Sequence, residues 1–245
     1  AKAIVALGAG RCPARAVQQL GPHIGYWAFK TKSCGSDMDA VGFTKAIKKH
    51  GKRSAWQLSL GTLWDMQQHS IAPDAVAFNI AMASCGRDNQ WQQALGTLSE
   101  MPHRALSPDA VSCNVAINVC GKSKQWQHAL GVLSGMRWIA VTPEVISFNT
   151  AISACERSAQ WQQALVLLAD MRKVLLNATV VTYGAAISAC GKGAQLQWAL
   201  ALFSDMRRWG IPVDRVCYGA VISACGNVGH WQQALHLLGM MHISR

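Results

Sequence analysis

Residues 124–136 read KQWQHALGVLSGM, and nearly the same wording recurs as NQWQQALGTLSEM at 89–101 and as AQWQQALVLLADM at 159–171. The copies are offset by 35 residues, and Trp56 and Trp231 continue the same row, which only Leu196 interrupts. A fixed period between about 20 and 50 residues marks a repeat architecture, in which each unit covers the apolar face of its neighbour. The sequence therefore predicts a stacked array.

A frame with repeats starting at 40, 75, 110, 145, 180 and 215 divides residues 40–245 into five full units and a truncated sixth. In the unit 145–179, apolar side chains recur at i, i+3, i+4 and i+7, at Phe148, Ala151, Ile152 and Cys155. This spacing is typical of an amphipathic helix, and Ser147 is a candidate for its N-cap. A second apolar stripe begins at Trp161 and predicts a second helix. The predicted fold class is therefore all-α, an α-solenoid of 35-residue helical hairpins.

Two further rows end the first helix of each unit. Glycine recurs at 51, 86, 121, 191 and 226, where we expect the left-handed backbone of a helix terminus. Cysteine recurs at 85, 120, 155, 190 and 225. Stacked helices lie about 8–10 Å apart, whereas a disulfide needs Cα atoms within about 7 Å, and no CxxC or paired Cys/His spacing for zinc occurs. We expect reduced thiols in a helix seam, and neither a metal nor a cofactor.

The net charge of +11 is distributed unevenly along the chain. Residues 1–55 hold ten of the 23 Lys/Arg and only two acids, so the N-terminal end is strongly basic and the rest only mildly so. A basic end can meet RNA, an anionic membrane surface or an acidic partner. Residues 1–36 contain no acid, as in organellar targeting segments, but we favour a degenerate, basic and helical segment of the mature chain over 1–39. No uncharged apolar run approaches the roughly 18 residues of a membrane span.

The amino-acid sequence of the repeats resembles that of the pentatricopeptide repeat (PPR) family. The stretches PDAVAFNIAMASCGRDNQWQQALGTLSEM and VVTYGAAISACGKGAQLQWALALFSDMRRWGI carry the V-x-[FY]-N opening (with Gly184 in place of Asn in the second), the Cys-Gly-Lys type of turn, the Ala-Leu pair and the closing Met. This resemblance covers about 40–245. It implies a right-handed superhelix in a mitochondrion or plastid that binds single-stranded RNA, with about one base read per repeat.

The resemblance also assigns roles to particular slots. Base-packing side chains occupy the second residue of each unit, at Val41, Val76, Val111, Ile146, Val181 and Val216. The base-reading pairs, formed by the fifth and last residues, are Thr44 with Asp74, Asn79 with Asp109, Asn114 with Glu144, and Asn149 with Thr179. The first pair resembles a guanine reader and the second a uracil reader. The third pair is not among the family's usual combinations, and the fourth indicates a weak preference for a pyrimidine. Gly184 and Gly219 have no side chain with which to read a base.

A row of cations has two interpretations, which are compatible with each other. Its members are Lys52, Arg87, Lys122, Arg157 and Lys192, and Asn227 interrupts it. On an RNA-binding array such a row would neutralise successive phosphates, the role that the resemblance implies and that we favour. Alternatively, each cation complements the dipole at a helix C-terminus, worth about 0.3–1 kcal/mol.

Catalysis is not expected. Gly121-Lys122-Ser123 is not the end of a P-loop, because Ala116 stands where that motif requires glycine. No nucleophile–base pair, paired carboxylate or deaminase signature occurs, so we predict a non-enzymatic protein without catalytic residues. The preferred function is binding of single-stranded RNA in organellar RNA stability, processing or translation. The alternative is a structural scaffold subunit that contacts protein partners in a large organellar assembly, for example a ribosome.

Overall fold

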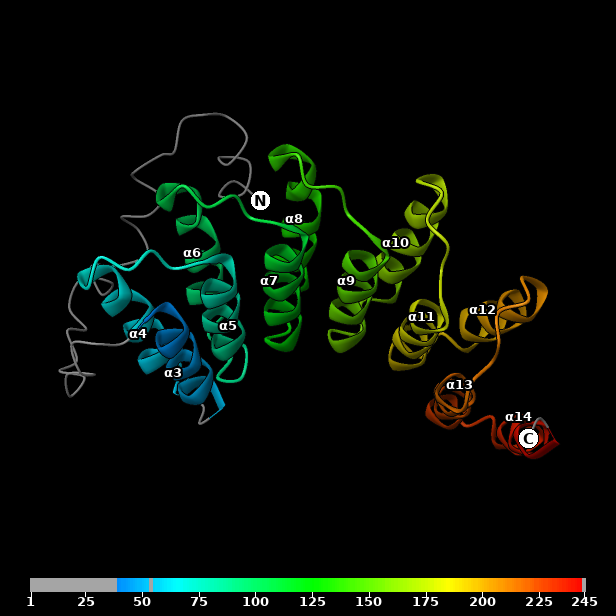
Figure 1. The fold of residues 1–245 in the computed structure, drawn as a ribbon. Helices are drawn as coiled ribbons and strands as arrows, with labels where there is room; N and C mark the ends of the chain where they lie inside the picture. Colours follow the sequence, from blue (N-terminus) through cyan, green and yellow to red (C-terminus); the bar gives the residue numbers. More distant parts are fainter. Residues whose placement is uncertain (1–38, 53–54, 244–245) are drawn as a thin grey trace. The chain divides into compact units, whose positions relative to one another are not determined.

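The computed structural model describes residues 39–52 and 55–243, in which the regular elements are all helical (Figure 1). The first helices of the repeats are α3 (Ala40–Lys52), α5 (Ala75–Cys85), α7 (Ala110–Lys122), α9 (Val145–Arg157), α11 (Val180–Lys192) and α13 (Arg215–Val228). The second helices are α4 (Trp56–Gln68), α6 (Trp91–Glu100), α8 (Trp126–Gly135), α10 (Trp161–Lys173), α12 (Leu196–Arg208) and α14 (Trp231–Ile243). Short 3-10 turns η2 (Pro102–Arg104) and η3 (Met136–Ile139) follow α6 and α8. The predicted basic segment 1–39 lies outside the described residues, Asp39 apart.

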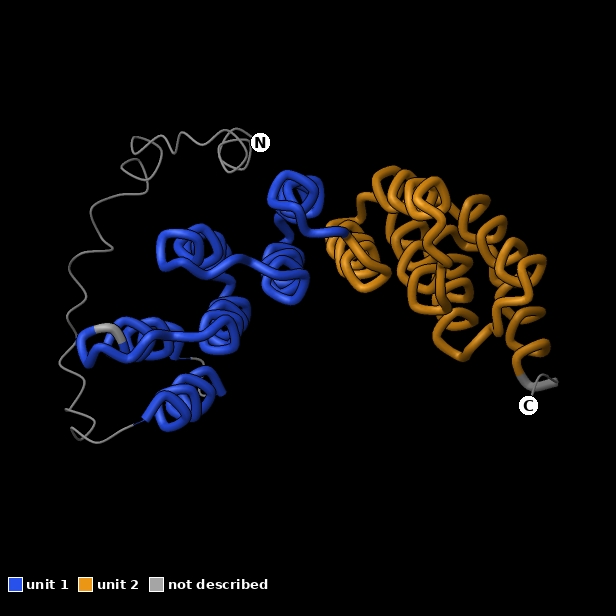
Figure 2. The backbone as a smooth tube through the Cα atoms, turned by 45° about the horizontal axis from the view of Figure 1, so that its top comes forward, with its two compact units in different colours: residues 1–142 blue, residues 143–245 orange. Residues whose placement is uncertain are grey.

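The chain divides into two compact units, residues 1–142 and 143–245, and each is described here by itself (Figure 2). In the first unit α3 packs on α5 and α5 on α7; in the second, α9 packs on α11 and α11 on α13. Each second helix packs on the first helix of its own hairpin, and α4, α6, α10 and α12 also pack on the first helix of the following hairpin. The predicted all-α array of stacked hairpins is therefore confirmed within both units.

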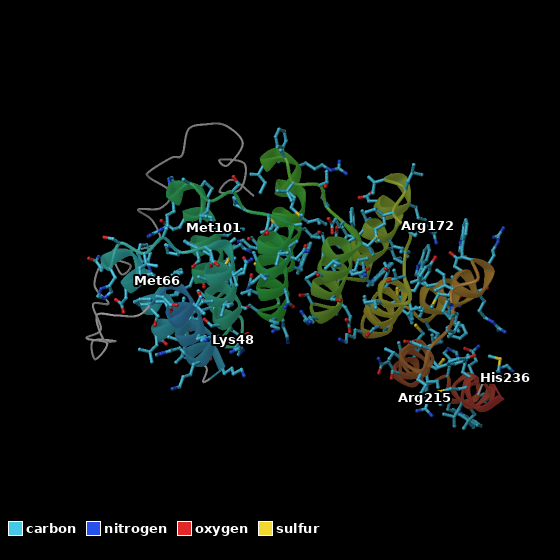
Figure 3. All side chains as sticks on the ribbon, viewed as in Figure 1. Lys48, Met66, Met101, Arg172, Arg215 and His236 are labelled. Atoms are coloured by element: carbon cyan, nitrogen blue, oxygen red, sulfur yellow. The ribbon has the colours of Figure 1, made fainter. Side chains whose placement is uncertain are left out.

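Periodic apolar rows form the core between the two helices of each hairpin. Methionines that close the second helices are at most 1% exposed, and they are Met66, Met101, Met136, Met171 and Met206 (Figure 3 labels the first two). A flexible thioether fills the space between neighbouring hairpins well. The tryptophans that begin α4, α6, α8 and α10 are partly buried, and Trp231, which begins α14, is exposed. Trp91 packs against His128 of the next repeat, with 4.3 Å between ring centroids, and Trp161 stacks on Trp198 at 6.5 Å.

The glycine row does not supply the left-handed backbone, so that prediction was wrong. Gly86 has φ −68°, and the left-handed residues come three positions after the glycine slot, at Asn89, Lys124, Ala159, Ala194 and Gly229. The amide after each left-handed residue donates to a helix carbonyl five residues back, as Gln125 N does to Cys120 O at 2.8 Å. This arrangement is a Schellman motif, which ends the helix without needing glycine at the earlier slot.

Close contact between first helices explains the glycine at some of these positions instead. A Cβ on Gly86 would lie 2.8 Å from Val119 Cγ2 of the next repeat, and a Cβ on Gly191 would lie 3.0 Å from Ala224 Cβ. Carbon atoms in contact prefer separations of about 3.5–4.0 Å, so the helices lie too close for a side chain here. Where the slot holds Glu156, its carboxylate instead accepts from Ser188 Oγ at 2.8 Å and pairs with Lys192 Nζ at 2.9 Å.

The cap of α9 also differs from the sequence prediction. Glu144, not Ser147, is the N-cap residue, and Ser147 Oγ accepts from the Glu144 amide at 3.2 Å as part of a capping box. Asp74, Asp109, Thr179 and Asp214 cap α5, α7, α11 and α13 in the same position. The last residue of each repeat frame therefore satisfies an otherwise unpaired amide of the following helix.

The cysteine row lies inside the core. Cys85, Cys120, Cys155, Cys190 and Cys225 are buried free thiols, as are Cys113 and Cys217. Burial raises the pKa of Cys85, Cys120 and Cys155 to about 12, because an apolar surrounding disfavours the thiolate. These side chains act as small apolar groups in the seam between hairpins.

Candidate nucleic-acid interface

A row of exposed aliphatic side chains lies in the first turn of the first helices. Its members are 54–69% exposed, and they are Val41, Val76, Val111, Ile146, Val181 and Val216, the predicted base-packing residues. The Met and Cys rows of the repeats are buried, whereas this row is exposed, so packing within the hairpin does not account for it. An exposed aliphatic at the same slot of six successive repeats is a surface on which flat apolar groups can pack.

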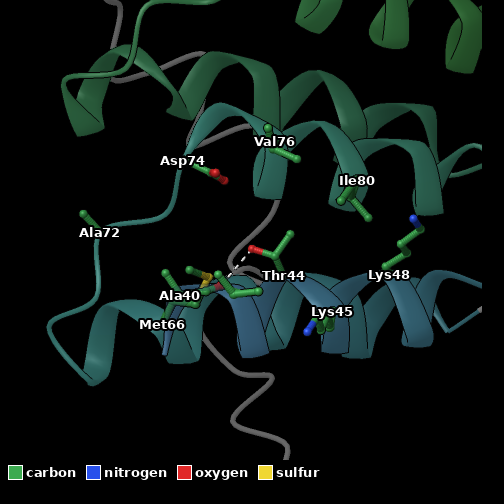
Figure 4. A pocket seen from close by; sticks show the side chains of 10 residues that line it. Ala40, Thr44, Lys45, Lys48, Met66, Ala72, Asp74, Val76 and Ile80 are labelled. Atoms are coloured by element: carbon green, nitrogen blue, oxygen red, sulfur yellow. Dashed lines mark hydrogen bonds between the residues drawn. The ribbon is translucent and has the colours of Figure 1, made fainter. Parts of the chain in front are cut away.

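In the first unit, a groove of about 370 Å³ lies between α3 and α5 (Figure 4). Its lining includes two members of the aliphatic row, Val41 and Val76, and the first predicted reading pair, Thr44 and Asp74. The structure thus brings together side chains from two repeats that are far apart in sequence. We call this space the first groove.

The first groove presents hydrogen-bond acceptors. Thr44 Oγ1 donates its hydrogen to Ala40 O at 2.9 Å, which leaves its lone pairs for a ligand. Asp74 Oδ1 accepts from the Ala77 amide at 2.7 Å as the N-cap of α5, so the carboxylate's other oxygen remains. Two acceptors favour a base edge that carries two donors, and guanine has such an edge in its N1–H and N2–H groups.

The second reading pair, also in the first unit, offers a mixed pattern. Asp109 Oδ1 accepts from both the amide and the hydroxyl of Ser112 at 2.7 Å, which again leaves the second carboxylate oxygen. Asn79 Oδ1 is buried without a hydrogen-bond partner. A buried, unpaired carbonyl costs about 1–3 kcal/mol, and rotation of the amide would present both a donor and an acceptor to a ligand. A donor beside acceptors fits uracil, whose edge alternates acceptor and donor.

The third pair is divided between the two units. Asn114 belongs to α7 of the first unit, and its Oδ1, like that of Asn79, is buried without a partner. Glu144 belongs to the second unit and caps α9. Each residue is therefore described only in its own surroundings, and their use as a pair stays a prediction.

The fourth pair is brought together, but its groups are engaged with each other. Asn149 Nδ2 donates to Thr179 Oγ1 at 3.4 Å, and Asn149 Oδ1 accepts from Thr182 Oγ1 at 2.6 Å. A base would have to compete with this network for the same donor and acceptor. The pyrimidine preference of this pair stays a prediction, and these contacts would weaken any preference.

The last two repeats hold glycine at the fifth slot, where the other repeats hold a predicted reading side chain. A Cβ on Gly184 would lie 3.5 Å from Cys217 Sγ, which is ordinary contact, and a Cβ on Gly219 would meet nothing within 4 Å. Steric crowding therefore does not require glycine at either position. Asp214 nevertheless caps α13, with Oδ1 accepting from the Cys217 amide at 2.8 Å.

The predicted phosphate row is exposed, and two of its members, Arg87 and Lys192, reach back to the preceding repeat. Lys192 pairs with Glu156 as described, and a Cβ on Gly51 would lie 3.4 Å from Arg87 Nη1. Asn227, which interrupts the row, donates from Nδ2 to Gly191 O at 3.0 Å. These contacts place the row beside the C-terminus of the preceding first helix, where cations are favourable. Lys52 and Lys122 carry their ammonium groups on exposed residues at the ends of α3 and α7.

Sequence reasoning missed the residues that hold the readers in place. Ser112 and Thr182 occupy the third slot of their repeats and bind Asp109 and Asn149. For Ser112 a signal was present, because a polar residue three positions after an N-cap residue is a capping pattern, whereas no local pattern indicates the contact of Thr182 with Asn149 in the preceding repeat. Among the described residues, no three His, Cys, Asp or Glu gather as a metal site, and none of the described helices is long and apolar enough to cross a membrane.

Models of known protein families match most of the chain. The PPR repeat family model matches residues 73–122 and 178–227, the pentatricopeptide repeat domain model matches 141–193, and the PPR repeat model matches 111–139 and 216–244. Together these matches extend over residues 73–244. No curated protein matches the chain in sequence.

Solved structures show the same fold. The crystal structure of the pentatricopeptide repeat protein PPR10 from maize aligns with a TM-score of 0.61 and 22% identity, over 97% of this chain and 32% of that one. PPR10 in complex with an 18-nt psaJ RNA element aligns with a TM-score of 0.65 and 24% identity, over 84% of this chain and 34% of that one. The PPR domain of Arabidopsis thaliana protein-only RNase P 1 in complex with tRNA aligns with a TM-score of 0.55 and 13% identity, over 67% of this chain and 87% of that one. The chain thus spans about a third of the length of PPR10.

Proposed function

Because the chain belongs to the pentatricopeptide repeat family, we propose that it binds single-stranded RNA and acts in the stability, processing or translation of organellar RNA. Members of this family are typically organellar, so the proposed location is a mitochondrion or plastid. The proposed role is non-catalytic and uses no cofactor. Two related proteins have been solved with RNA bound, PPR10 with its RNA element and the RNase P domain with tRNA.

The observation that carries the proposal is the exposed aliphatic row beside reading side chains. In the first groove, Val41 and Val76 offer apolar surface to the faces of a base, while Thr44 and Asp74 offer acceptors to its edge. Contacts of this kind contribute about 1–3 kcal/mol per base. Two good repeats alone would give weak binding, so electrostatic attraction to phosphates must supply the rest.

The base preferences are proposed from the resemblance to the family's usual pairings, and the acceptor patterns are compatible with them. The first groove selects guanine and the next selects uracil, so the favoured strand begins 5′-GU and runs 5′ to 3′ along the array. Asn114 with Glu144 and Asn149 with Thr179 contribute little selectivity. The third pair departs from the usual pairings, and the fourth is engaged in its own network.

The proposal is tested by measuring RNA binding as a function of salt. Five phosphate contacts on a single strand predict a log–log salt slope near −3.5, from roughly −0.7 per contact. Changing Lys52, Arg87, Lys122, Arg157 and Lys192 to Gln should flatten that slope while the circular-dichroism spectrum stays helical. No salt-dependent binding to any pool of random RNA would contradict the proposal.

Selectivity is tested at a single residue. Asn79→Thr recreates in the second repeat the Thr–Asp pair of the first, so the preferred second base should change from uracil to guanine. The discrimination should be about 1–3 kcal/mol, and the salt slope should not change because no phosphate contact is altered. An unchanged base preference would mean that this slot does not read RNA.

One observation favours a second role as a scaffold. Large apolar side chains are exposed at the ends of second helices, with Trp138 73%, Leu175 89% and Trp209 66% exposed. Such side chains are often covered by a protein partner. Migration of the native protein in a large assembly that survives ribonuclease treatment would support this role, and migration that collapses on ribonuclease treatment would support RNA binding.

A further inference from the structure

Two lysines in the first groove set the first repeat apart from the others. Lys45 and Lys48 lie on α3 and line the groove together with Thr44 and Asp74 (Figure 4). The equivalent positions in the following five repeats hold no cation; they are Ile80, Val115, Thr150, Ala185 and Ala220 in the slot of Lys45, and Ala83, Asn118, Ser153, Ser188 and Ser223 in the slot of Lys48. The extra positive charge is therefore confined to one groove.

Folding alone does not explain these lysines. α3 contains four lysines and no acid, and Lys45, Lys48 and Lys52 are spaced three and four residues apart on one helix face. Like charges at this spacing destabilise a helix. The macrodipole favours cations in the last turn, which accounts for Lys49 and Lys52 but not for Lys45 near the middle of the helix.

Both ammonium groups are available to an anion. Lys45 and Lys48 are exposed, and among the described residues neither has a carboxylate within salt-bridge distance. Asp74, the acid in the same groove, is engaged through Oδ1 with the Ala77 amide. A bound phosphate would relieve the repulsion along α3, because it would place negative charge between the two lysines.

The cation row leaves one phosphate of a bound strand without a partner. Every base has a phosphate on each side, so a strand has one more flanking phosphate than it has bases. The row holds one cation in each of the first five repeats, so for five bases it matches all of these phosphates except one at an end. If the strand begins at the first repeat, the unmatched phosphate is the one on the 5′ side of the base in the first groove.

We propose that Lys45 and Lys48 form a phosphate site for the group on the 5′ side of the nucleotide held by Thr44 and Asp74. This inference rests on the proposed binding of RNA. The phosphate can be a terminal monoester or a diester to a preceding nucleotide, since both present anionic oxygens to an ammonium group. A terminal monoester carries about −1.5 to −2 charges at pH 7 and a diester one, so the monoester binds more tightly.

The test uses three forms of one hexanucleotide that begins GU, with a 5′-hydroxyl, a 5′-phosphate or a three-nucleotide 5′ extension. Affinities are measured by fluorescence anisotropy on the full chain. We expect the extension to bind the native protein about tenfold more tightly than the 5′-hydroxyl form, as charge-assisted hydrogen bonds would give, and the 5′-phosphate form to bind more tightly still. The salt slope should steepen by about 0.7 for the added contact.

Matched variants assign the gain to these two side chains. Lys45→Gln with Lys48→Gln should abolish the gain and leave binding of the 5′-hydroxyl form within about twofold. Lys45→Arg with Lys48→Arg should keep the gain. Lys122→Gln, the control, should weaken all three ligands by the same factor. A gain from the phosphate alone identifies a monoester site, and a gain from the extension as well identifies a diester site.

Two results would overturn the inference while leaving the proposed function intact. One is equal affinity of the native protein for all three forms, and the other is a Gln variant that weakens all three equally. Failure of the native protein to bind any of the three RNAs would instead overturn the proposed function itself.

Discussion

Replacing Gly86 by alanine tests whether close helix contact determines the glycine row. The new methyl group would lie 2.8 Å from Val119 Cγ2 and 3.5 Å from Val119 Cα. Val119 is 2% exposed, and a β-branched side chain has little rotamer freedom in a helix. The contact can therefore be relieved only if α5 and α7 move apart.

The expected magnitude is the difference between two opposing terms. Overpacking of this kind costs about 1–3 kcal/mol. Alanine in place of glycine would by itself stabilise a helix by about 0.5–1 kcal/mol, because it restricts the unfolded chain. Gly86→Ala should thus lower the free energy of unfolding by about 1–2 kcal/mol.

Two control variants isolate the steric term. Gly226→Ala changes the same slot of the last repeat, and Gly96→Ala changes α6 in the same unit; a Cβ at either position meets nothing within 4 Å. Both should stabilise the protein by up to about 1 kcal/mol. Urea unfolding followed by circular dichroism should move the midpoint down for Gly86→Ala and up for the controls. A rise for Gly86→Ala that equals the rise for Gly226→Ala would refute the reasoning.

Gly184→Asn should add a uracil preference at the fifth base, because it completes the Asn–Asp pair with Asp214 and its Cβ fits at 3.5 Å from Cys217 Sγ. Fluorescence anisotropy with RNAs that differ at the fifth base measures this preference. Equal affinities for all four bases would count against the assignment of this slot to base reading. The buried thiols should resist a thiol reagent at pH 8 until urea is added, since burial raises their pKa to about 11–12. Their contribution to stability is complete below the ordinary thiol pKa of 9.0 and is lost as pH rises toward about 12, so the urea midpoint should fall over that window; a flat profile would contradict it. Glu156→Gln removes the ion pair with Lys192, whose side chain is 47% exposed, and should cost less than about 1 kcal/mol in urea unfolding; a larger loss would mean that the pair holds the helices together.

The repeat frame could be predicted from the sequence because its signals are local and periodic. Apolar side chains at helical spacing, such as Phe148 and Ile152, indicate a buried helix face wherever they occur, and a 35-residue period requires that neighbouring faces meet. The exposed aliphatic row beginning at Val41 could not be separated from the core by periodicity. Its assignment to base packing came from the resemblance to a known family, and the structure adds that the row is exposed.

Misassigned roles arose where the partner lies in another repeat. Gly86 appeared to be a turn residue because glycine commonly ends helices, whereas its neighbour Val119, 33 residues away, is what requires it. Asn149 does donate to its predicted partner Thr179, but no local pattern indicates that Thr182 of the next repeat occupies its acceptor. Contacts of this kind depend on the distance between packed helices, which the sequence of one hairpin does not specify.

The sequence by itself determined that the chain forms stacked helical hairpins, because hydrophobic periodicity and helix-ending signals act within a single repeat. Only the tertiary structure decided which polar groups remain free to meet a ligand. One hydrogen-bonding group is satisfied within the helix itself and an acceptor is left open at three of the predicted readers, Thr44, Asp74 and Asp109. The acceptor of Asn149, in contrast, is occupied by a hydroxyl of the next repeat. The physical reason is that a hydrogen bond is directional and short, so its formation depends on tenths of an ångström between helices that only packing can set.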